Sequence, residues 1–289
     1  MDSHLLVRSP LSYQGSKYKL LAALQQNCSP VKVLHDVFGG SGTVGLNMPI
    51  AKTVHINELD PNVYGVLCHL KSRPTWQEIV KQLDATIRKH KLGNTREYED
   101  AYYRFRNKFN KSPNWFDLWV LSKHSFSSLI RFNEEGEFNL PFGFRSPQKS
   151  KSRDFWIQQF WTRLQRVKLH NKTYLQYVKH ALAKADKSHV FYFDPPYLAS
   201  GANVYVGEWT AADDQKLRDL LDYLNKIGIR WVLSNVTKHR GHKNKPLAKW
   251  MKQYNYSYPS FTGKGELYSL NRAADTKDNG TVEVIIKNF

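Results

Sequence analysis

The chain is poor in cysteine and has no long apolar run. Its 289 residues include two cysteines, Cys28 and Cys68, which is too few for a disulfide framework or a paired Cys-type metal motif. A run of about 18 apolar residues is absent, so we expect no membrane-spanning helix. The apolar stretch before Arg8 is shorter than the core of a secretory signal, so we expect no signal peptide. A reducing cytoplasm is the compartment that these absences favour.

Motifs for metal binding and for nucleophilic catalysis are also missing. The segment HRGH at 239–242 has no cysteine or acid at ligand spacing, so it favours a basic loop over a metal site. The pattern G-x-S-x-G does not occur. We therefore expect neither a bound metal nor a covalent enzyme intermediate.

Acidic residues are scarce as well. The chain carries 43 Lys and Arg against 25 Asp and Glu, a formal net charge of +18 with a pI near 9.7. Such an excess indicates a polyanionic partner, most simply nucleic acid. A basic protein without such a partner is the alternative that charge alone leaves open.

Strand and helix patterns alternate at both ends of the chain. Residues 33–38 and 53–57 read as strands around a glycine-rich turn, and 190–193, 229–236 and 281–286 read as later strands. Thr210 and Asp213 form a capping-box pattern before a helix whose apolar face runs from Leu217 to Ile227 and stops at Gly228. The alternation predicts an α/β fold with a mostly parallel, doubly wound sheet.

The middle of the chain has a different composition. Residues 71–170 hold 20 Lys and Arg and 10 Asp and Glu, whereas the other 189 residues hold 23 and 15. Five of the eight tryptophans also lie there, and 75–90 has the apolar periodicity of a helix. We interpret 71–170 as an inserted, mainly helical, basic domain, with 1–70 and 171–289 forming the domain that it interrupts.

The glycine-rich turn DVFGGSGTVG lies between a predicted strand and a predicted helix. Gly40, Gly42 and Gly45 fit G-x-G-x-x-G, and Glu58 follows 18 residues after Gly40, where a carboxylate binds ribose hydroxyls in dinucleotide-type sites. An ordinary tight turn is the structural alternative. As a binding site, the turn fits either a nicotinamide enzyme or an S-adenosylmethionine enzyme.

The segment VFYFDPPYL ends a strand with an acid, two prolines and a tyrosine. Asp194 and the carbonyl of Pro195 offer two acceptors to one amino group, Pro196 stiffens the corner, and Tyr197 offers a face on which a base can stack. Taken alone, Asp-Pro-Pro-Tyr is more simply read as a turn.

The order of these motifs resembles a known family. YQGSK at 13–17, DVFGGSG at 36–42, NELD at 57–60, the basic insert, DPPY at 194–197 and SNV at 234–236 are similar to the Dam family of α-group DNA adenine-N6 methyltransferases, most of all the T-even phage type. The resemblance covers nearly the whole chain. It implies a Rossmann-like, doubly wound methyltransferase sheet with an inserted, mainly helical target-recognition domain that carries a β-hairpin.

The resemblance also implies the site residues. The expected S-adenosylmethionine contacts are Tyr13, Gly15, Lys17, Asp36, Phe38, Gly40, Ser41, Glu58, Gln176, Tyr177 and Asp194. Gln176 and Tyr177 belong to YLQYV at 174–178, where many relatives carry an acid on the strand before DPPY. The expected DNA contacts are Arg106, Asn110, Phe126, Ser127, Leu129, Arg131, Asn133, Pro141 and Arg145. Arg131 matches the arginine that reads guanine, and Phe126, Ser127 and Leu129 match residues that intrude on the base stack or touch phosphate. An ordinary hairpin around Glu-Glu-Gly is the alternative for 124–145.

The activity implied is methyl transfer from S-adenosylmethionine to N6 of an adenine flipped out of duplex DNA, in the sequence GATC, with Asp194, Pro195, Pro196 and Tyr197 as the catalytic corner. The alternatives are an RNA adenine or DNA cytosine-N4 methyltransferase and an inert DNA-binding relative. The expected partner is double-stranded DNA, with no membrane or metal, in the cytoplasm of a bacterial or phage-infected cell. We expect a monomer in solution and allow a dimer on DNA.

Overall fold

A computed structural model describes residues 6–12, 15–48, 51–144, 151–198, 209–239, 241–259 and 280–289. Tyr13 and Arg145, two of the expected site residues, lie outside these ranges. The chain packs as two compact units, Met1–Ser16 with Pro61–Leu169 and Lys17–Asp60 with His170–Phe289.

These unit boundaries differ from the predicted ones at 70 and 171. The predicted break falls near the end of helix α3 (Pro61–Lys71), which packs against α6 (Trp115–His124) in the first unit. Gly65 of α3 lies so close to the Trp115 ring that a Cβ there would come within 2.6 Å of it. The indole of Trp119 also donates to the carbonyl of Pro10, which joins the N-terminal residues to this unit.

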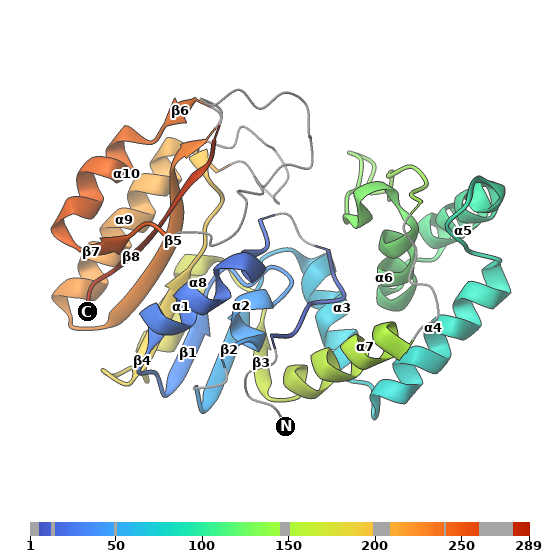
Figure 1. The fold of residues 1–289 in the computed structure, drawn as a ribbon, viewed down its shortest axis with the longest axis horizontal. Helices are drawn as coiled ribbons and strands as arrows, with labels where there is room; N and C mark the ends of the chain where they lie inside the picture. The colour runs from blue at the N-terminus through green and yellow to red at the C-terminus, as the bar shows by residue number, and fades with distance from the viewer. Residues whose placement is uncertain are drawn as a thin grey trace. The chain divides into compact units, whose positions relative to one another are not determined.

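The second unit contains one sheet, except for residues 167–169 of its edge strand, which belong to the first unit (Figure 1). Eight strands in the described residues form it, with the order β3-β2-β1-β4-β5-β8-β7 and β6 beside β5. Strands β2, β1, β4 and β5 are parallel, and β8 runs antiparallel to β5. Their bounds are β1 Val33–Asp36, β2 Thr53–Asn57, β3 Val167–His170, β4 His189–Phe193, β5 Arg230–His239, β6 His242–Lys243, β7 Asn255–Ser257 and β8 Val282–Lys287.

Helices pack against this sheet in two groups, which confirms the predicted doubly wound fold. Phe191 and Phe193 of β4 and Trp231 and Leu233 of β5 alternate along their strands, and all four join one fully buried cluster. Helices α8 (Tyr174–Leu182), α9 (Ala211–Lys226) and α10 (Lys245–Trp250) contribute to the same cluster. Helix α1 (Leu21–Cys28) packs against β5 and β8 with its own buried side chains, outside that cluster.

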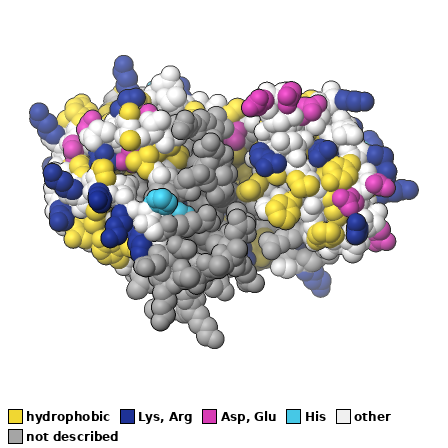
Figure 2. Space-filling view, turned by 90° about the horizontal axis from the view of Figure 1, so that it is seen from above, with side chains coloured by type: hydrophobic (Ala, Val, Ile, Leu, Met, Phe, Trp, Pro, Cys, Tyr) yellow, Lys and Arg dark blue, Asp and Glu magenta, His cyan; other side chains and the backbone are white. Residues whose placement is uncertain are grey.

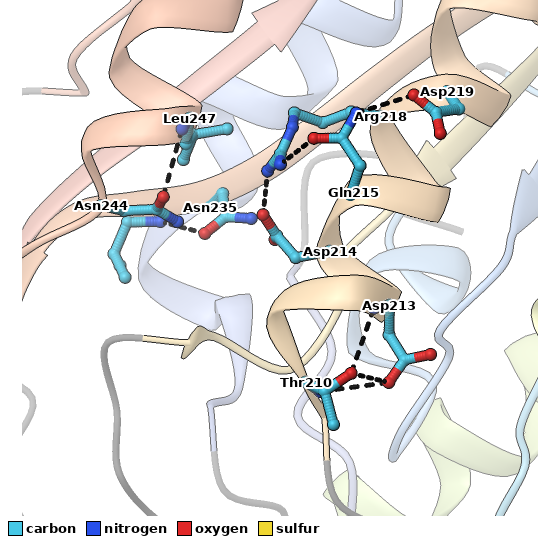
Figure 3. A network of polar contacts seen from close by, with 10 residues as sticks. Thr210, Asp213, Asp214, Gln215, Arg218, Asp219, Asn235, Asn244 and Leu247 are labelled. Atoms are coloured by element: carbon cyan, nitrogen blue, oxygen red, sulfur yellow. Dashed lines mark hydrogen bonds and ion pairs between the residues drawn. The ribbon is translucent and has the colours of Figure 1, made fainter.

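Side chains fix where helix α9 begins and ends. Thr210 and Asp213 form the predicted capping box, and Gly228 follows the helix at φ 75°. Inside the helix, Asp214 pairs with Arg218, and Asn235 of β5 lies near them (Figure 3). Both members of the ion pair are buried. Both residues belong to α9, so the pair stabilises the first turns of the helix, and replacing one partner would leave an uncompensated buried charge.

Residues 174–178 are helical, which corrects their expected place on the strand before DPPY. Thr173 caps α8 by accepting from the backbone of Gln176, and the Gln176 amide accepts from the backbone of Thr173. This capping box starts a helix at Tyr174. The strand before α8 is β3, which ends at His170.

A row of four histidines crosses four neighbouring strands of the sheet. The rings of His170, His55, His35 and His189, from β3, β2, β1 and β4, follow one another with centroids 4.9–5.2 Å apart. His35 is buried and its Nδ1 lies 2.7 Å from the hydroxyl of Tyr177. Burial, and then the neighbouring histidines, lowers the pKa of His35 from 6.5 to about 3.

The lowered pKa of His35 predicts a loss of stability in acid. Unfolded His35 takes up a proton below about 6.5 while the folded residue stays neutral, so its contribution is complete above pH 6.5 and is lost as the pH falls towards 3. At pH 5 the loss is about 2 kcal/mol. In urea titrations at pH 7 and pH 5, His35→Phe should lose less stability across this interval than the wild type. Tyr177→Phe, which keeps the imidazole, should lose as much as the wild type; equal losses in all three proteins would contradict the prediction.

The first unit is mainly helical and carries the predicted hairpin. Helix α4 (Trp76–His90), which lies within the predicted helix 75–90 and is capped by Thr75, packs on α7 (Lys151–Leu164), and α5 (Glu99–Lys111) packs on α6. Phe105, Phe116 and Trp119 are buried among these helices. The hairpin follows α6 and forms bridges between Ser125 and Phe142 and between Phe132 and Phe138.

None of the helices in the described residues is both long enough and apolar enough to cross a membrane.

Candidate functional site

The DPPY corner lies at the carboxyl end of β4, beside β5. The parallel register pairs Tyr192 with Val232 and Phe193 with Leu233, so Asp194 comes next to Ser234. The Ser234 hydroxyl donates to Asp194 Oδ1 at 2.9 Å. The Tyr192 hydroxyl lies 2.7 Å from Ser234 Oγ. The sheet therefore places the Asp194 carboxylate at its edge, and hydroxyl groups of buried strand residues hold it there.

Lys17 and Tyr197 approach the same carboxylate from other directions. Lys17, in the short helix η1 (Lys17–Leu20), is 3% exposed, and its Nζ lies 2.8 Å from Asp194 Oδ2. The Tyr197 hydroxyl donates to Asp194 Oδ1 at 2.9 Å, and the Lys17 ammonium lies 5.0 Å from the centre of the Tyr197 ring. The expected catalytic and cofactor residues Asp194, Tyr197 and Lys17 thus come together in one cluster.

The glycine-rich turn connects β1 to the short helix α2 (Thr43–Leu46) in the same unit. Gly40 and Gly42 have φ values of 52° and 78°, which favour glycine. A Cβ on Gly39 would lie 2.3 Å from Ile56, so the backbone approaches β2 too closely for a side chain. Asp36 Oδ2 accepts from the Gly45 amide at 2.9 Å. These contacts hold the turn in one conformation at the end of β1.

Glu58 is held by backbone amides. Its Oε2 accepts from Gly40 at 2.5 Å, and its Oε1 accepts from Asp60 at 2.8 Å. It is buried, as is Asp36, and burial raises the pKa of each carboxyl to about 7. Near neutral pH both groups can therefore carry a proton and donate as well as accept.

An aromatic group lies where β1 ends. The rings of Phe38, Tyr174 and Trp209 have centroids 5.4–5.9 Å apart. The Tyr174 hydroxyl is buried and has no hydrogen-bond partner among the described residues. Tyr177, which the sequence placed in the cofactor site, is instead buried against His35, and Gln176 is exposed in the α8 cap. Tyr174 is the residue of this segment that lies beside Phe38.

In the first unit, one face of α5 holds the hairpin. Tyr102, Arg106 and Asn110 recur every four residues, so they project from one side of the helix. The Tyr102 hydroxyl and Arg106 Nη1 both donate to the Leu140 carbonyl, at 2.8 and 3.1 Å. Asn110 exchanges two hydrogen bonds with the backbone of Phe138. Arg106 and Asn110, expected to contact DNA, are bound to the hairpin backbone.

Between its two bridges, the hairpin has a strained segment with an exposed aromatic ring. Ser127 and Ser128 have φ values of 60° and 53°, a left-handed conformation that non-glycine residues rarely adopt. Phe126 is 60% exposed and Phe144 is 63% exposed. Figure 2 shows hydrophobic side chains on the visible face of this unit, with charged side chains of both signs around them. Strain of this kind is typical of binding sites.

Three more of the expected residues lie along the hairpin, two of them near its tip and Pro141 near its base. Arg131 is exposed, and its Nε donates to Asn139 Oδ1 at 2.9 Å. Asn133 closes the turn by accepting from the backbone of Glu137 with its Oδ1, and Gly136 has a φ of 77°. Pro141 is exposed and its carbonyl accepts from Phe126. The contact with Asn139 thus joins Arg131 to the other arm of the hairpin.

The sequence did not reveal which residues support Asp194 and the hairpin. Ser234 was noticed as part of SNV without a role, and Tyr192 was read as a strand residue. Their contact with Asp194 depends on strand order and register, which one sequence does not disclose. Tyr102 was detectable in principle, because it lies four residues before Arg106 on a helix.

Comparison with known proteins finds one family and several relatives, all of them methyltransferases by name. The family described as D12 class N6 adenine-specific DNA methyltransferase matches residues 13–262. The chain is similar to "Modification methylase StsI" of Streptococcus sanguinis, at 31% identity over 98% of this chain and 43% of the relative. It is similar to "Type II methyltransferase M.FokI" of Planomicrobium okeanokoites, at 30% identity over 98% of this chain and 43% of the relative. The "DNA adenine methylase" of Escherichia coli K12 is 27% identical over 79% of this chain and 80% of the relative.

The chain spans about two fifths of the length of the first two relatives. The matched part includes the glycine-rich turn, the hairpin and the DPPY corner, since all three lie within residues 13–262.

Proposed function

Because the chain belongs to the D12 class of N6 adenine-specific DNA methyltransferases, we propose that it methylates N6 of an adenine flipped out of duplex DNA, with S-adenosylmethionine as the methyl donor. The observation that carries the proposal is the placement of Asp194. Its carboxylate stands at the carboxyl edge of a parallel sheet, held by Ser234, Tyr197 and Lys17. Ligands of open α/β sheets bind at this edge.

The residues present fit the cofactor. Three carboxyl groups, those of Asp36, Glu58 and Asp194, lie around the glycine-rich turn and Lys17. Such carboxyl groups suit a ligand that carries a sulfonium, an ammonium and ribose hydroxyls. We propose that Gly40, Ser41 and Lys17 face its amino-acid part and that Glu58 receives the ribose. Phe38 and Tyr174 would hold its adenine, with the unpaired Tyr174 hydroxyl as a partner. When bound, the cofactor supplies an electrophilic methyl group.

The acceptor adenine would bind at the DPPY corner. Asp194 and the Pro195 carbonyl each accept one hydrogen from the N6 amine, which turns the nitrogen lone pair towards the methyl group. Tyr197 stacks on the base, and Pro196 limits the motion of the corner. With the amine held in this way, its nitrogen would accept the methyl group that the cofactor supplies, and water would take the N6 proton that is lost.

We propose that the hairpin reads the DNA sequence. Arg131 matches a guanine-reading position, and a guanidinium can donate to both O6 and N7 of guanine. The exposure of Phe126 and the strained backbone beside it support a role in entering the base stack, and we propose that Ser127 and Leu129 contact the DNA with it. Asn133, Pro141 and Arg145 are proposed contacts on the resemblance to enzymes that read GATC. We also propose that the chain is of the T-even phage type and that the enzyme is monomeric. It would act in the cytoplasm of a bacterial or phage-infected cell.

The test is to map methylated bases. DNA from cells that express the chain is sequenced for N6-methyladenine, and the purified protein is assayed with labelled cofactor on duplexes containing GATC and on scrambled duplexes. The expected result is methylated adenine within GATC. Methylated adenine in another sequence would overturn the specificity alone; methylated cytosine, or methylation of RNA in place of DNA, would overturn the acceptor.

A further inference from the structure

We propose that Tyr192 and Ser234 form a buried chain of hydrogen-bond donors that fixes the Asp194 carboxylate in its working orientation. Both are positioning residues, because they act through Asp194 and do not touch the substrate. The inference rests on the proposed function and adds to it two residues that the motif comparison does not assign.

The direction of the chain follows from its protons. Ser234 has one hydroxyl proton, which it donates to Asp194 Oδ1 at 2.9 Å. The 2.7 Å contact between Tyr192 and Ser234 therefore has the tyrosine hydroxyl as donor and Ser234 Oγ as acceptor. Burial raises the pKa of Tyr192 well above 10, so the phenol keeps its proton at any working pH.

Burial makes this chain difficult for water to replace. Tyr192 is 0% exposed and Ser234 is 1% exposed. Both side chains come from the interior of neighbouring parallel strands, whose backbone positions are set by the sheet. A donor held in this way offers one direction of approach, so it selects one rotamer of Asp194.

Tyr197 and Lys17, which also contact Asp194, are held less firmly during the proposed reaction. Tyr197 donates to the same Oδ1, but it lies outside the strand and would stack on the incoming base. Lys17 faces Oδ2 and belongs to a segment expected to contact the cofactor. Ser234 is the partner that stays when substrate and cofactor enter, and it orients Asp194 towards the amine.

The hydrogen bonds of Tyr192 and Ser234 are not needed to join β4 to β5. Four consecutive pairs, from Val190 with Arg230 to Phe193 with Leu233, already align these strands through their backbones. The side-chain bond lies one residue beyond the last of these pairs, where the chain leaves the sheet and Asp194 needs support. The chain of donors therefore acts on side-chain orientation.

The experiment compares single variants in steady-state methylation assays, with cofactor affinity measured by calorimetry and folding by thermal melts. Ser234→Ala should lower kcat by roughly ten- to a hundred-fold, the effect of one hydrogen bond to a charged group. The KM for DNA and the cofactor Kd should stay near wild type. Tyr192→Phe should lower kcat less, and Ser234→Thr, which keeps the donor, should recover most of the activity.

Two matched controls separate positioning from stability. Ser188→Ala removes a serine-to-aspartate hydrogen bond of the same kind, to Asp186 before the start of β4. Tyr254→Phe removes another tyrosine hydroxyl, which donates to Asp222. Both controls should keep wild-type kcat in assays run below their melting temperatures.

Each outcome decides the proposal. Wild-type kcat in Ser234→Ala, or a folded Ser234→Thr that is as slow as Ser234→Ala, would overturn the donor chain and leave the proposed function intact. An equal loss of kcat in Ser188→Ala would also overturn it. Absence of methyl transfer by the wild type would overturn the proposed function and this inference with it.

Discussion

Replacement of Asp194 by Ala should reduce methyl transfer by on the order of a thousand-fold or more, because alignment of the reacting atoms is the main contribution that this site can make. The variant would lose the carboxylate that we propose accepts from the adenine amine. It also removes the partner of Lys17 and of the hydroxyls of Ser234 and Tyr197. The nitrogen lone pair would then be free to point away from the methyl group.

Single-turnover methylation, with cofactor binding by calorimetry, measures this effect. Cofactor affinity should remain measurable in Asp194→Ala, because the glycine-rich turn is held by Asp36 and Glu58 and does not depend on Asp194. Asp186→Ala is the matched control, since Asp186 accepts from Ser188 in an exposed turn before the same strand. Turnover of Asp194→Ala close to that of the wild type would exclude Asp194 as the residue that holds the amine.

Elements with a local cause were predictable from the sequence. Helices α4 and α9 begin after Thr75 and Thr210 because a hydroxyl satisfies a free backbone amide there. Strand β2 occupies the predicted residues 53–57, and β5 and β8 differ from their predictions by a few residues at their ends. In each case the signal lies within a few residues of the element that it sets.

Long-range relations were not predictable. Arg106 and Asn110 were expected at DNA, but the α5 face that carries them holds the hairpin 28 to 34 residues later in the chain. Tyr177 was expected at the cofactor, because 174–178 was assigned by comparison with a strand motif. The Thr173 capping box, a local signal, correctly indicates a helix there. The motif comparison selected the right segment, but Tyr174 is the residue of that segment that lies beside Phe38.

Gly143→Ala should weaken binding to the preferred DNA sequence by roughly ten-fold or more, since each base contact that depends on the hairpin contributes about 1–3 kcal/mol of discrimination. A Cβ on Gly143 would lie 2.3 Å from the Ser125 carbonyl oxygen and 2.8 Å from the Phe126 amide nitrogen. Both are backbone atoms, so the strand must move. The Gly143 amide would then lose its 2.8 Å bond to the His124 carbonyl.

The measurement compares affinity for a GATC duplex and a scrambled duplex at one salt concentration, because phosphate contacts alone make affinity depend on salt. Gly280→Ala is the control, since a Cβ there meets nothing within 4 Å. Arg131→Ala separates the two ways of losing specificity: it should relax discrimination at the guanine position alone, whereas Gly143→Ala should relax every position that the hairpin reads. Cofactor binding should survive in both variants, because Arg131 and Gly143 lie in the first unit and Lys17, Asp36 and Glu58 lie in the second. Undiminished discrimination by Gly143→Ala would show that the bases are read elsewhere than on this hairpin.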